Sequence, residues 1–133
     1  AALEWLRQAS EKEPDNLNNL MVYANWLRDT DQFELALIVY ENAIEKFPEY
    51  WPSYLYLAWG YYLNDYLENA IQTIEEAIEL NNNDIGIYLL AGQIYESSGR
   101  VDKAFDAYQR VLELDPDNGT ALEAIQRLNQ SNE

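Results

Sequence analysis

The sequence has no cysteine and no histidine, so two residue types on which much enzyme chemistry depends are missing. Disulfide bonds, thiol nucleophiles and imidazole acid–base catalysis are therefore excluded. A chain without cysteine fits a reducing cytoplasm, which we favour, and it leaves a bacterial periplasm open.

Positive charge is scarce as well. Eight Lys and Arg residues stand against 24 Asp and Glu residues, which gives a formal net charge of -16 at pH 7. This field repels the phosphates of nucleic acids and the headgroups of anionic lipids, so neither is expected as a partner. The carboxylates would suit a basic partner, although solubility is the simpler interpretation and the one we favour.

Long apolar runs are also lacking. No stretch reaches the ~18–20 residues that a bilayer-spanning helix requires, so membrane insertion is not expected. The first five residues, Ala1 to Trp5, carry neither an initiator methionine nor the charge pattern of a signal peptide. We therefore expect the chain to be a fragment of a larger protein.

The many carboxylates do not form a recognisable catalytic or metal-binding pattern. Glu75, Glu76 and Glu79 fall on the outer face of an expected helix, where nothing separates their pKa values as an acid–base pair requires. Residues 115–119 resemble the start of a calcium loop, but its twelfth position is Gln126, so the bidentate glutamate is absent. We expect no enzyme activity, no metal and no cofactor.

What the sequence does contain is a period of thirty-four residues. Pro14 and Pro48 are one period apart, and Pro116 lies two periods further on. Small residues keep the same spacing: Ala2, Ala36, Ala70 and Ala104 form one series, and Ala24, Ala58 and Gly92 form another. A third series of large residues consists of Leu20, Tyr54 and Tyr88. So many coincident positions predict an internal repeat.

Each period contains two helical patterns joined by a short polar turn. Leu20, Ala24 and Leu27 recur at spacings of three and four, which predicts one face of a helix. A second apolar face runs from Phe33 to Ile44. Gly99 is a natural left-handed cap between two such helices, and proline ends the second helices because it disfavours helical geometry in the residue before it.

A helix–turn–helix unit of this length and pattern resembles the tetratricopeptide repeat. Residues 85–118 match the family pattern best, through Tyr88, Ala91, Gly92, Tyr95, Gly99, Ala104, Tyr108 and Pro116. The resemblance implies an all-α fold, a right-handed superhelical solenoid of antiparallel helix pairs. We expect the second helix of a truncated repeat at 1–16, full repeats at 17–50, 51–84 and 85–118, and a closing helix and tail at 119–133.

The resemblance also implies that the first helix of each pair lines a concave groove. In the helix at 51–64, packing already uses Tyr54, Leu57, Ala58 and Tyr61, so its remaining residues make it apolar nearly all round. Two interpretations stay open: neighbouring helices bury these rings, or they form an aromatic site for a peptide or helix. We favour the second, because exposed Trp and Tyr are typical of binding surfaces.

The predicted partner-binding residues are those on the groove face of the first helices. They are Met21, Asn25, Arg28, Leu55, Tyr56, Trp59, Tyr62, Leu63, Leu89, Gln93 and Arg127, and Asn18, Val22, Pro52, Gly86, Leu90, Glu96, Thr120 and Glu123 share that face. Asn25 and Gln93 are expected to bond a ligand's main chain, and Arg28 and Arg127 to meet a carboxylate. The predicted function is a protein–protein interaction scaffold for a protein or peptide with an apolar segment. The alternative is a structural or regulatory arm of a larger enzyme or of a secretion or assembly complex.

One known mode of the family is rejected. Its chaperone cofactors grip a C-terminal carboxylate with lysine, asparagine and arginine on the groove helices. The matching positions here are Met21, Asn25, Tyr56, Gly86 and Leu90, and only Asn25 agrees. A site without a cation cannot compensate a buried carboxylate.

The helix at 1–16 offers a second candidate surface. Leu3, Trp5 and Leu6 lie on a helix whose own partner helix is missing. We expect its apolar side to contact upstream repeats of a longer protein or a second copy of this chain in a homodimer.

Overall fold

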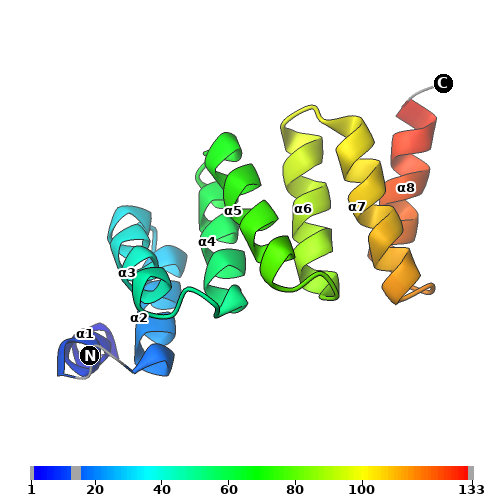
Figure 1. Cartoon of the computed structure of the whole chain (residues 1–133). Helices are drawn as coiled ribbons and strands as arrows, with labels where there is room; N and C mark the ends of the chain where they lie inside the picture. Colours follow the sequence, from blue (N-terminus) through cyan, green and yellow to red (C-terminus); the bar gives the residue numbers. More distant parts are fainter. Residues whose placement is uncertain (1, 13–15, 132–133) are drawn as a thin grey trace.

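The computed structural model describes residues 2–12 and 16–131, and every regular element in that part of the chain is an α-helix. The helices are α1 (Ala2–Lys12), α2 (Leu17–Asp29), α3 (Phe33–Lys46), α4 (Trp51–Leu63), α5 (Leu67–Leu80), α6 (Ile85–Ser97), α7 (Val101–Leu114) and α8 (Gly119–Ser131). They stand side by side in a row, with the two termini at opposite ends (Figure 1). The predicted all-α class is confirmed.

The helices associate as consecutive pairs. The strongest packing is of α2 on α3, α4 on α5 and α6 on α7, and each pair then packs on the next through α3–α4, α5–α6 and α7–α8. Such an arrangement buries each helix between its neighbours along the chain, so stability comes from stacking rather than from one central core.

Side-chain caps start several first helices at the same place in the period. Asn16, Asp84 and Asn118 each accept a hydrogen bond from the backbone N–H three residues later, at 3.1, 2.9 and 3.0 Å. These bonds satisfy backbone donors that a helix start leaves free. Helix α4 begins differently, with Tyr50 at the cap position and Pro52 in its first turn, where proline costs no hydrogen bond.

The turns inside the pairs share one left-handed residue. Asp31 and Asp65 have φ of 64°, and Gly99, which takes the cap role predicted for it, has φ of 79°. The backbone N–H of the residue after each of them donates a hydrogen bond to the carbonyl five residues earlier. The N···O distances are 2.9 Å for Gln32, 2.9 Å for Tyr66 and 2.8 Å for Arg100. These are the bonds that close a helix C-terminus before the chain reverses.

Small residues and aromatic rings together set the distance between neighbouring helices, both within a pair and between pairs. Ala24, Ala58 and Gly92 are buried, and a Cβ placed on Gly92 would lie 2.5 Å from the ring of Tyr108. The ring of Phe33 crowds Gly60 in the same way between α3 and α4. Glycine at these points lets a large ring fill the space between two helices, which gives the close packing of a protein interior.

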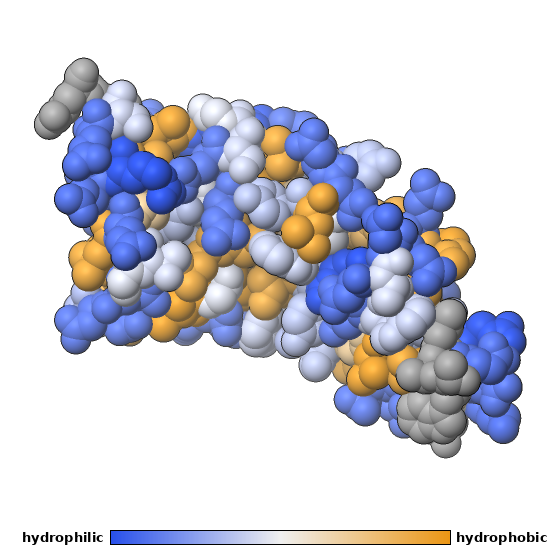
Figure 2. All heavy atoms as spheres, turned by 180° about the vertical axis from the view of Figure 1, so that it is seen from behind, coloured by the Kyte–Doolittle hydropathy of each residue, from blue (hydrophilic) through white to orange (hydrophobic). Residues whose placement is uncertain are grey.

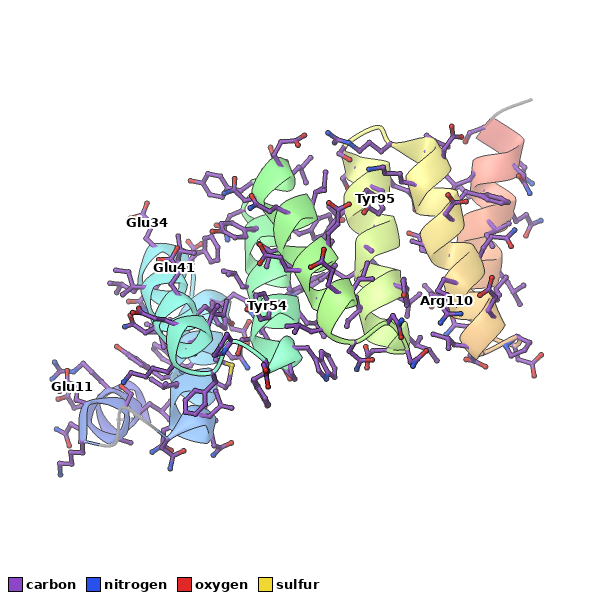
Figure 3. The ribbon with its side chains drawn as sticks, in the orientation of Figure 1. Glu11, Glu34, Glu41, Tyr54, Tyr95 and Arg110 are labelled. Atoms are coloured by element: carbon purple, nitrogen blue, oxygen red, sulfur yellow. The ribbon has the colours of Figure 1, made fainter. Side chains whose placement is uncertain are left out.

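Polar contacts link successive pairs at the turns between them. Tyr54 donates to the carbonyl of Pro48 and Tyr88 to the carbonyl of Asn82, both at 2.9 Å and one period apart. Arg110 of α7, labelled in Figure 3, donates to the carbonyl of Asn82 and to the side chain of Asn83, both at 3.1 Å. The turn before α6 is therefore held from both sides.

Helix α1 packs on α2 at the N-terminal end of the row. Leu6 is only 7% exposed, so it has little surface to offer a second copy, contrary to the expectation for this residue. Leu3 and Trp5 lie in α1, but their side chains are outside the described part of the structure. In that part, no helix is both long and apolar enough to cross a bilayer.

Candidate functional site

The first helices of the pairs, together with α8, present equivalent positions to one face. One series is Asn25, Trp59, Gln93 and Arg127, and a second is Met21, Leu55, Leu89 and Glu123. Two adjoining hollows lie along these helices, and both are lined by Trp59 and Gln93. We call the two hollows together the groove. On the face seen in Figure 2, several patches of apolar residues lie among hydrophilic ones.

One of the two hollows, which we call the apolar hollow, has a volume of about 400 Å³. It is lined by Arg28, Leu55, Tyr56, Trp59, Gly86, Leu89, Leu90 and Gln93. Six of these are predicted partner-binding residues, so the structure brings residues from α2, α4 and α6 together as a single wall. Its lining is mainly aliphatic and aromatic with few polar groups, which is typical of a ligand pocket.

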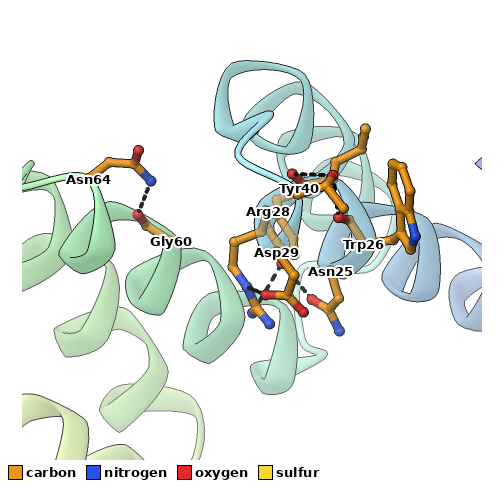
Figure 4. A network of polar contacts seen from close by, with 9 residues as sticks. Asn25, Trp26, Arg28, Asp29, Tyr40, Gly60 and Asn64 are labelled. Atoms are coloured by element: carbon orange, nitrogen blue, oxygen red, sulfur yellow. Dashed lines mark hydrogen bonds and ion pairs between the residues drawn. The ribbon is translucent and has the colours of Figure 1, made fainter.

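Arg28 forms one edge of the apolar hollow and is already engaged there. Its guanidinium pairs with Asp29 at 2.9 Å, lies 5.9 Å from the centre of the Tyr56 ring and donates to the Tyr40 hydroxyl at 3.4 Å. Tyr40 in turn donates to Asn25, and Figure 4 shows this network from close by. Burial raises the pKa of Tyr40, so the hydroxyl keeps its proton and its role as donor.

The other hollow, which we call the aromatic–acidic hollow, has a volume of about 410 Å³. It is lined by Trp59, Tyr62, Gln93, Glu96, Ser97, Tyr108, Thr120, Glu123, Ala124 and Arg127. The rings of Trp59 and Tyr62 lie against each other with centroids 5.7 Å apart and planes at 30°. This hollow therefore combines two aromatic faces with charged groups contributed by α6 and α8.

Glu96 is the best-connected group in the aromatic–acidic hollow. Its Oε1 accepts hydrogen bonds from the Tyr108 hydroxyl and from Nη2 of Arg127, both at 2.6 Å. Burial is the main cause that raises the pKa of Tyr108, and the Glu96 carboxylate raises it further. Tyr108 thus remains a proton donor, and Glu96 is held in one orientation at the groove.

Three of the predicted partner-binding residues line neither hollow. Met21 is only 5% exposed because it lies inside the packing of α2 against α4, where the Ser53 hydroxyl is 3.5 Å from its sulfur. It supports the groove from within, which corrects its expected place on the surface. Asn25 is bonded to Tyr40, and Leu63 is 53% exposed near the end of α4.

Three lining residues of the aromatic–acidic hollow, Ser97, Tyr108 and Ala124, were not predicted from the sequence. Tyr108 lies on a second helix, which the pattern assigns to packing, and its ring is indeed almost fully buried. Its hydroxyl nevertheless reaches the groove through Glu96. The equivalent residue one period earlier is Ile74, so an aliphatic side chain is enough for packing at this position. The hydroxyl of Tyr108 was therefore the sequence signal for an additional polar role.

Among the described residues, no group of three or more histidine, cysteine, aspartate or glutamate side chains is placed to hold a metal ion. The groove is therefore described by its aromatic, apolar and hydrogen-bonding groups.

Comparison with known proteins places these features in a family. The tetratricopeptide repeat model matches residues 52–84 and 85–118, together half of the chain. A probable UDP-N-acetylglucosamine–peptide N-acetylglucosaminyltransferase of Solanum lycopersicum is 28% identical over 105 residues, covering 79% of this chain. The mitochondrial import receptor subunit TOM70 of Homo sapiens is 26% identical over 119 residues, covering 86% of this chain. The chain spans only 11% and 19% of these two relatives.

Solved structures agree in fold. The crystal structure of MamA superposes with a TM-score of 0.90 at 21% identity, covering 98% of this chain and 77% of that one. The first tetratricopeptide repeat domain of Spaghetti (RPAP3), solved with the HSP90 peptide SRMEEVD, has a TM-score of 0.83 at 20% identity. This similarity covers 89% of this chain and 94% of that one. These likenesses confirm the predicted right-handed superhelical solenoid, and with the family match they show that this chain belongs to the tetratricopeptide repeat family.

Proposed function

We propose that the chain is a protein–protein interaction scaffold whose groove holds a segment of another polypeptide, with an apolar side chain in the apolar hollow. The observation that carries this proposal is the lining of that hollow. Leu55, Tyr56 and Trp59 are only half-buried, although they lie on a helix that is apolar nearly all round. When a partner covers rings and aliphatic groups that are left open in a concave site, the burial of their apolar surface favours binding.

The relatives support the kind of partner. The RPAP3 domain is bound to a peptide of HSP90, and TOM70 is an import receptor subunit, so similar domains meet other polypeptides. The chemistry of this groove differs from a carboxylate clamp, since Gly86 and Leu90 line the apolar hollow where a clamp would place its cations. We therefore propose an internal apolar segment as the ligand rather than a chain terminus.

Gln93 has a special place in this proposal. It lines both hollows, and its amide offers both a donor and an acceptor. A segment that crosses from one hollow to the other would pass this side chain, which can then bond the ligand main chain as the sequence suggested.

The test compares two tryptophans of the same helix. A random library of displayed peptides, each of about twelve residues so that an extended chain can cross the groove, is selected on the immobilised protein. We expect Trp59→Ala to abolish enrichment and Trp51→Ala to retain it, because Trp51 lies outside both hollows. Both variants are checked by far-ultraviolet circular dichroism.

The control is informative because both tryptophans are partly buried on α4 and pack on the same cluster. Loss of helicity in Trp59→Ala alone would make its ring a core element and contradict the proposal. Equal enrichment on the wild type and Trp59→Ala would contradict it as well.

The second candidate, a structural or regulatory arm of a larger protein, is favoured by one comparison. The plant relative is an enzyme by name, and the chain matches only 11% of its length. In that case the groove would hold another part of the same assembly. Selected peptides that match a segment of the full-length gene product would favour this candidate.

A further inference from the structure

The two hollows of the groove differ in charge. The apolar hollow has one cation at its edge, Arg28, which is paired with Asp29. The aromatic–acidic hollow contains two carboxylates, Glu96 and Glu123, and one cation, Arg127. Its lining therefore carries an excess of one negative charge, in a chain whose net charge is -16. A cationic group is attracted to this end of the groove and an anionic group is repelled.

Both carboxylates have capacity left for a ligand. Glu96 uses only Oε1 for its two bonds, and its Oε2 has no partner among the described residues. Glu123 is exposed and makes no ion pair within that part of the chain, although Arg127 lies one helical turn away. A carboxylate accepts several hydrogen bonds, so an incoming ammonium or guanidinium group finds free acceptors in this hollow.

The aromatic rings supply the rest of a cation site. Trp59 and Tyr62 lie against each other on the wall of the hollow, and the faces of such rings attract cations within ~6 Å of their centres. The Tyr108 hydroxyl donates a hydrogen bond to the Glu96 carboxylate and so fixes its position. Aromatic faces on one side and carboxylates on the other suit the flat guanidinium of arginine or the ammonium of lysine.

We propose that the aromatic–acidic hollow receives an arginine or lysine side chain of the same polypeptide segment whose apolar side chain fills the apolar hollow. This inference rests on the proposed function and names the chemistry of the partner. The bound segment is amphipathic, with an apolar residue toward α2 and a basic residue toward α8.

The helices set the spacing of those two residues. From Leu55 to Tyr62 on α4, and from Leu89 to Glu96 on α6, the lining advances seven residues, which is about 10 Å at the helical rise. An extended chain covers ~3.4 Å per residue. The aromatic–acidic hollow is also displaced across the row by one first helix, since α8 replaces α2 in its lining, which adds ~10 Å and gives a separation of ~14 Å. The basic residue therefore follows or precedes the apolar one by about four positions, an even spacing that points both side chains to the same face of an extended chain.

The test uses a capped synthetic peptide as probe. It has the sequence acetyl-Ser-Gly-Leu-Gly-Ser-Gly-Arg-Ser-amide, and its partner peptide has Gln in place of Arg. Binding is followed by heteronuclear NMR on the indole N–H signal of Trp59, assigned by its loss in Trp59→Ala. We expect the Arg peptide to bind about threefold more tightly than the Gln peptide, with the difference shrinking as salt is added.

Variants with opposite effects make the test specific. Glu123→Gln is expected to remove most of the preference for Arg, and Arg127→Gln to increase it about twofold, because a competing cation is lost. The matched control is Glu45→Gln, which removes one negative charge from the exposed face of α3 outside the groove and is expected to leave the preference unchanged.

The outcomes separate the two proposals. If both peptides shift the Trp59 signal with equal affinity, the groove binds apolar segments and the cation site is overturned. If neither peptide shifts it, the proposed function fails together with the inference. A preference for Arg that Glu45→Gln reduces as much as Glu123→Gln reflects the overall charge of the protein, and it also overturns the assigned site.

Discussion

The hydroxyl of Tyr108 donates a hydrogen bond of 2.6 Å to Glu96, so a buried ring of α7 positions a carboxylate in the groove. Two periods earlier, Arg28 takes the place of Glu96 and donates to the hydroxyl of Tyr40 at 3.4 Å. The same register position thus carries a cation at one end of the solenoid and an anion at the other. The tyrosine serves both, because its hydroxyl can donate or accept.

The first prediction concerns the energy of the Tyr108 bond. Tyr108→Phe keeps the packing but leaves Glu96 with Arg127 alone. Hydrogen bonds to charged groups are worth about 1.5–3 kcal/mol when buried, so for this partly exposed pair we expect a loss of about 1–2 kcal/mol. Urea denaturation measures it. Tyr66→Phe, which removes the hydroxyl of an exposed ring, is the control and is expected to change stability by less than ~0.5 kcal/mol.

The second prediction concerns alkaline pH. Burial raises the pKa values of Tyr40, Tyr95 and Tyr108, and carboxylates raise those of Tyr95 and Tyr108 further. In the unfolded chain these tyrosines lose their protons near pH ~10. Above that pH the folded state binds more protons than the unfolded state, so the free energy of unfolding falls as pH rises. Below it, these groups have no effect on the slope.

Urea titrations at a series of pH values from about 8 to 11 measure this slope. Lysine residues also lose charge in that range, so the comparison is with Tyr40→Phe, which removes one of the three hydroxyls. We expect a shallower fall above pH ~10 in this variant. The same steep fall in both proteins would show that Tyr40 titrates as it does in the unfolded chain.

The fold was predictable because close packing leaves a regular trace in the sequence. Small residues are buried at one recurring position of the first helices, where Ala24, Ala58 and Gly92 stand one period apart. The sites in the groove were harder to predict. Met21, Leu55 and Leu89 share one register position, yet Met21 is buried while the other two line the apolar hollow. Burial there depends on how the next helix is placed, which the period does not encode.

The aromatic helix α4 is instructive in the same way. The sequence left open whether its rings are buried or form a site, and the structure places Tyr56, Trp59 and Tyr62 at intermediate burial on the walls of the two hollows. Neighbouring helices cover part of each ring and leave the rest open. A pattern of apolar residues indicates that a ring will be buried, but it does not indicate how much of the ring's surface the chain's own helices bury.

The third prediction contrasts two glycines. In Gly92→Ala the new Cβ would lie 2.5 Å from the ring of Tyr108, whereas in Gly119→Ala it would meet no atom within 4 Å. Alanine favours a helix by about 1 kcal/mol over glycine, but overpacking costs about 1–3 kcal/mol. We expect Gly92→Ala to destabilise the protein and Gly119→Ala to stabilise it slightly. Thermal and urea unfolding measure both, and a stabilised Gly92→Ala would mean that the Tyr108 ring can move.

The fourth prediction concerns the left-handed residue of the turns. Asp65 has φ of 64°, and the equivalent Gly99 has φ of 79°. A left-handed conformation costs an L-residue about 1–2 kcal/mol, although aspartate tolerates it better than most. The Asp65 side chain makes no hydrogen bond or ion pair within the described part of the chain that would repay this cost.

Asp65→Gly therefore removes backbone strain and also one of many negative charges. Glycine gives the unfolded chain more freedom, which returns about 0.4–1 kcal/mol of the gain. We expect a net stabilisation of about 0.5 kcal/mol, measured by urea unfolding at moderate salt. The reverse change, Gly99→Asp, is expected to destabilise the protein by a similar or larger amount. If both changes destabilise, then the turns are not equivalent, because some feature of the Asp65 turn depends on its carboxylate rather than on φ alone.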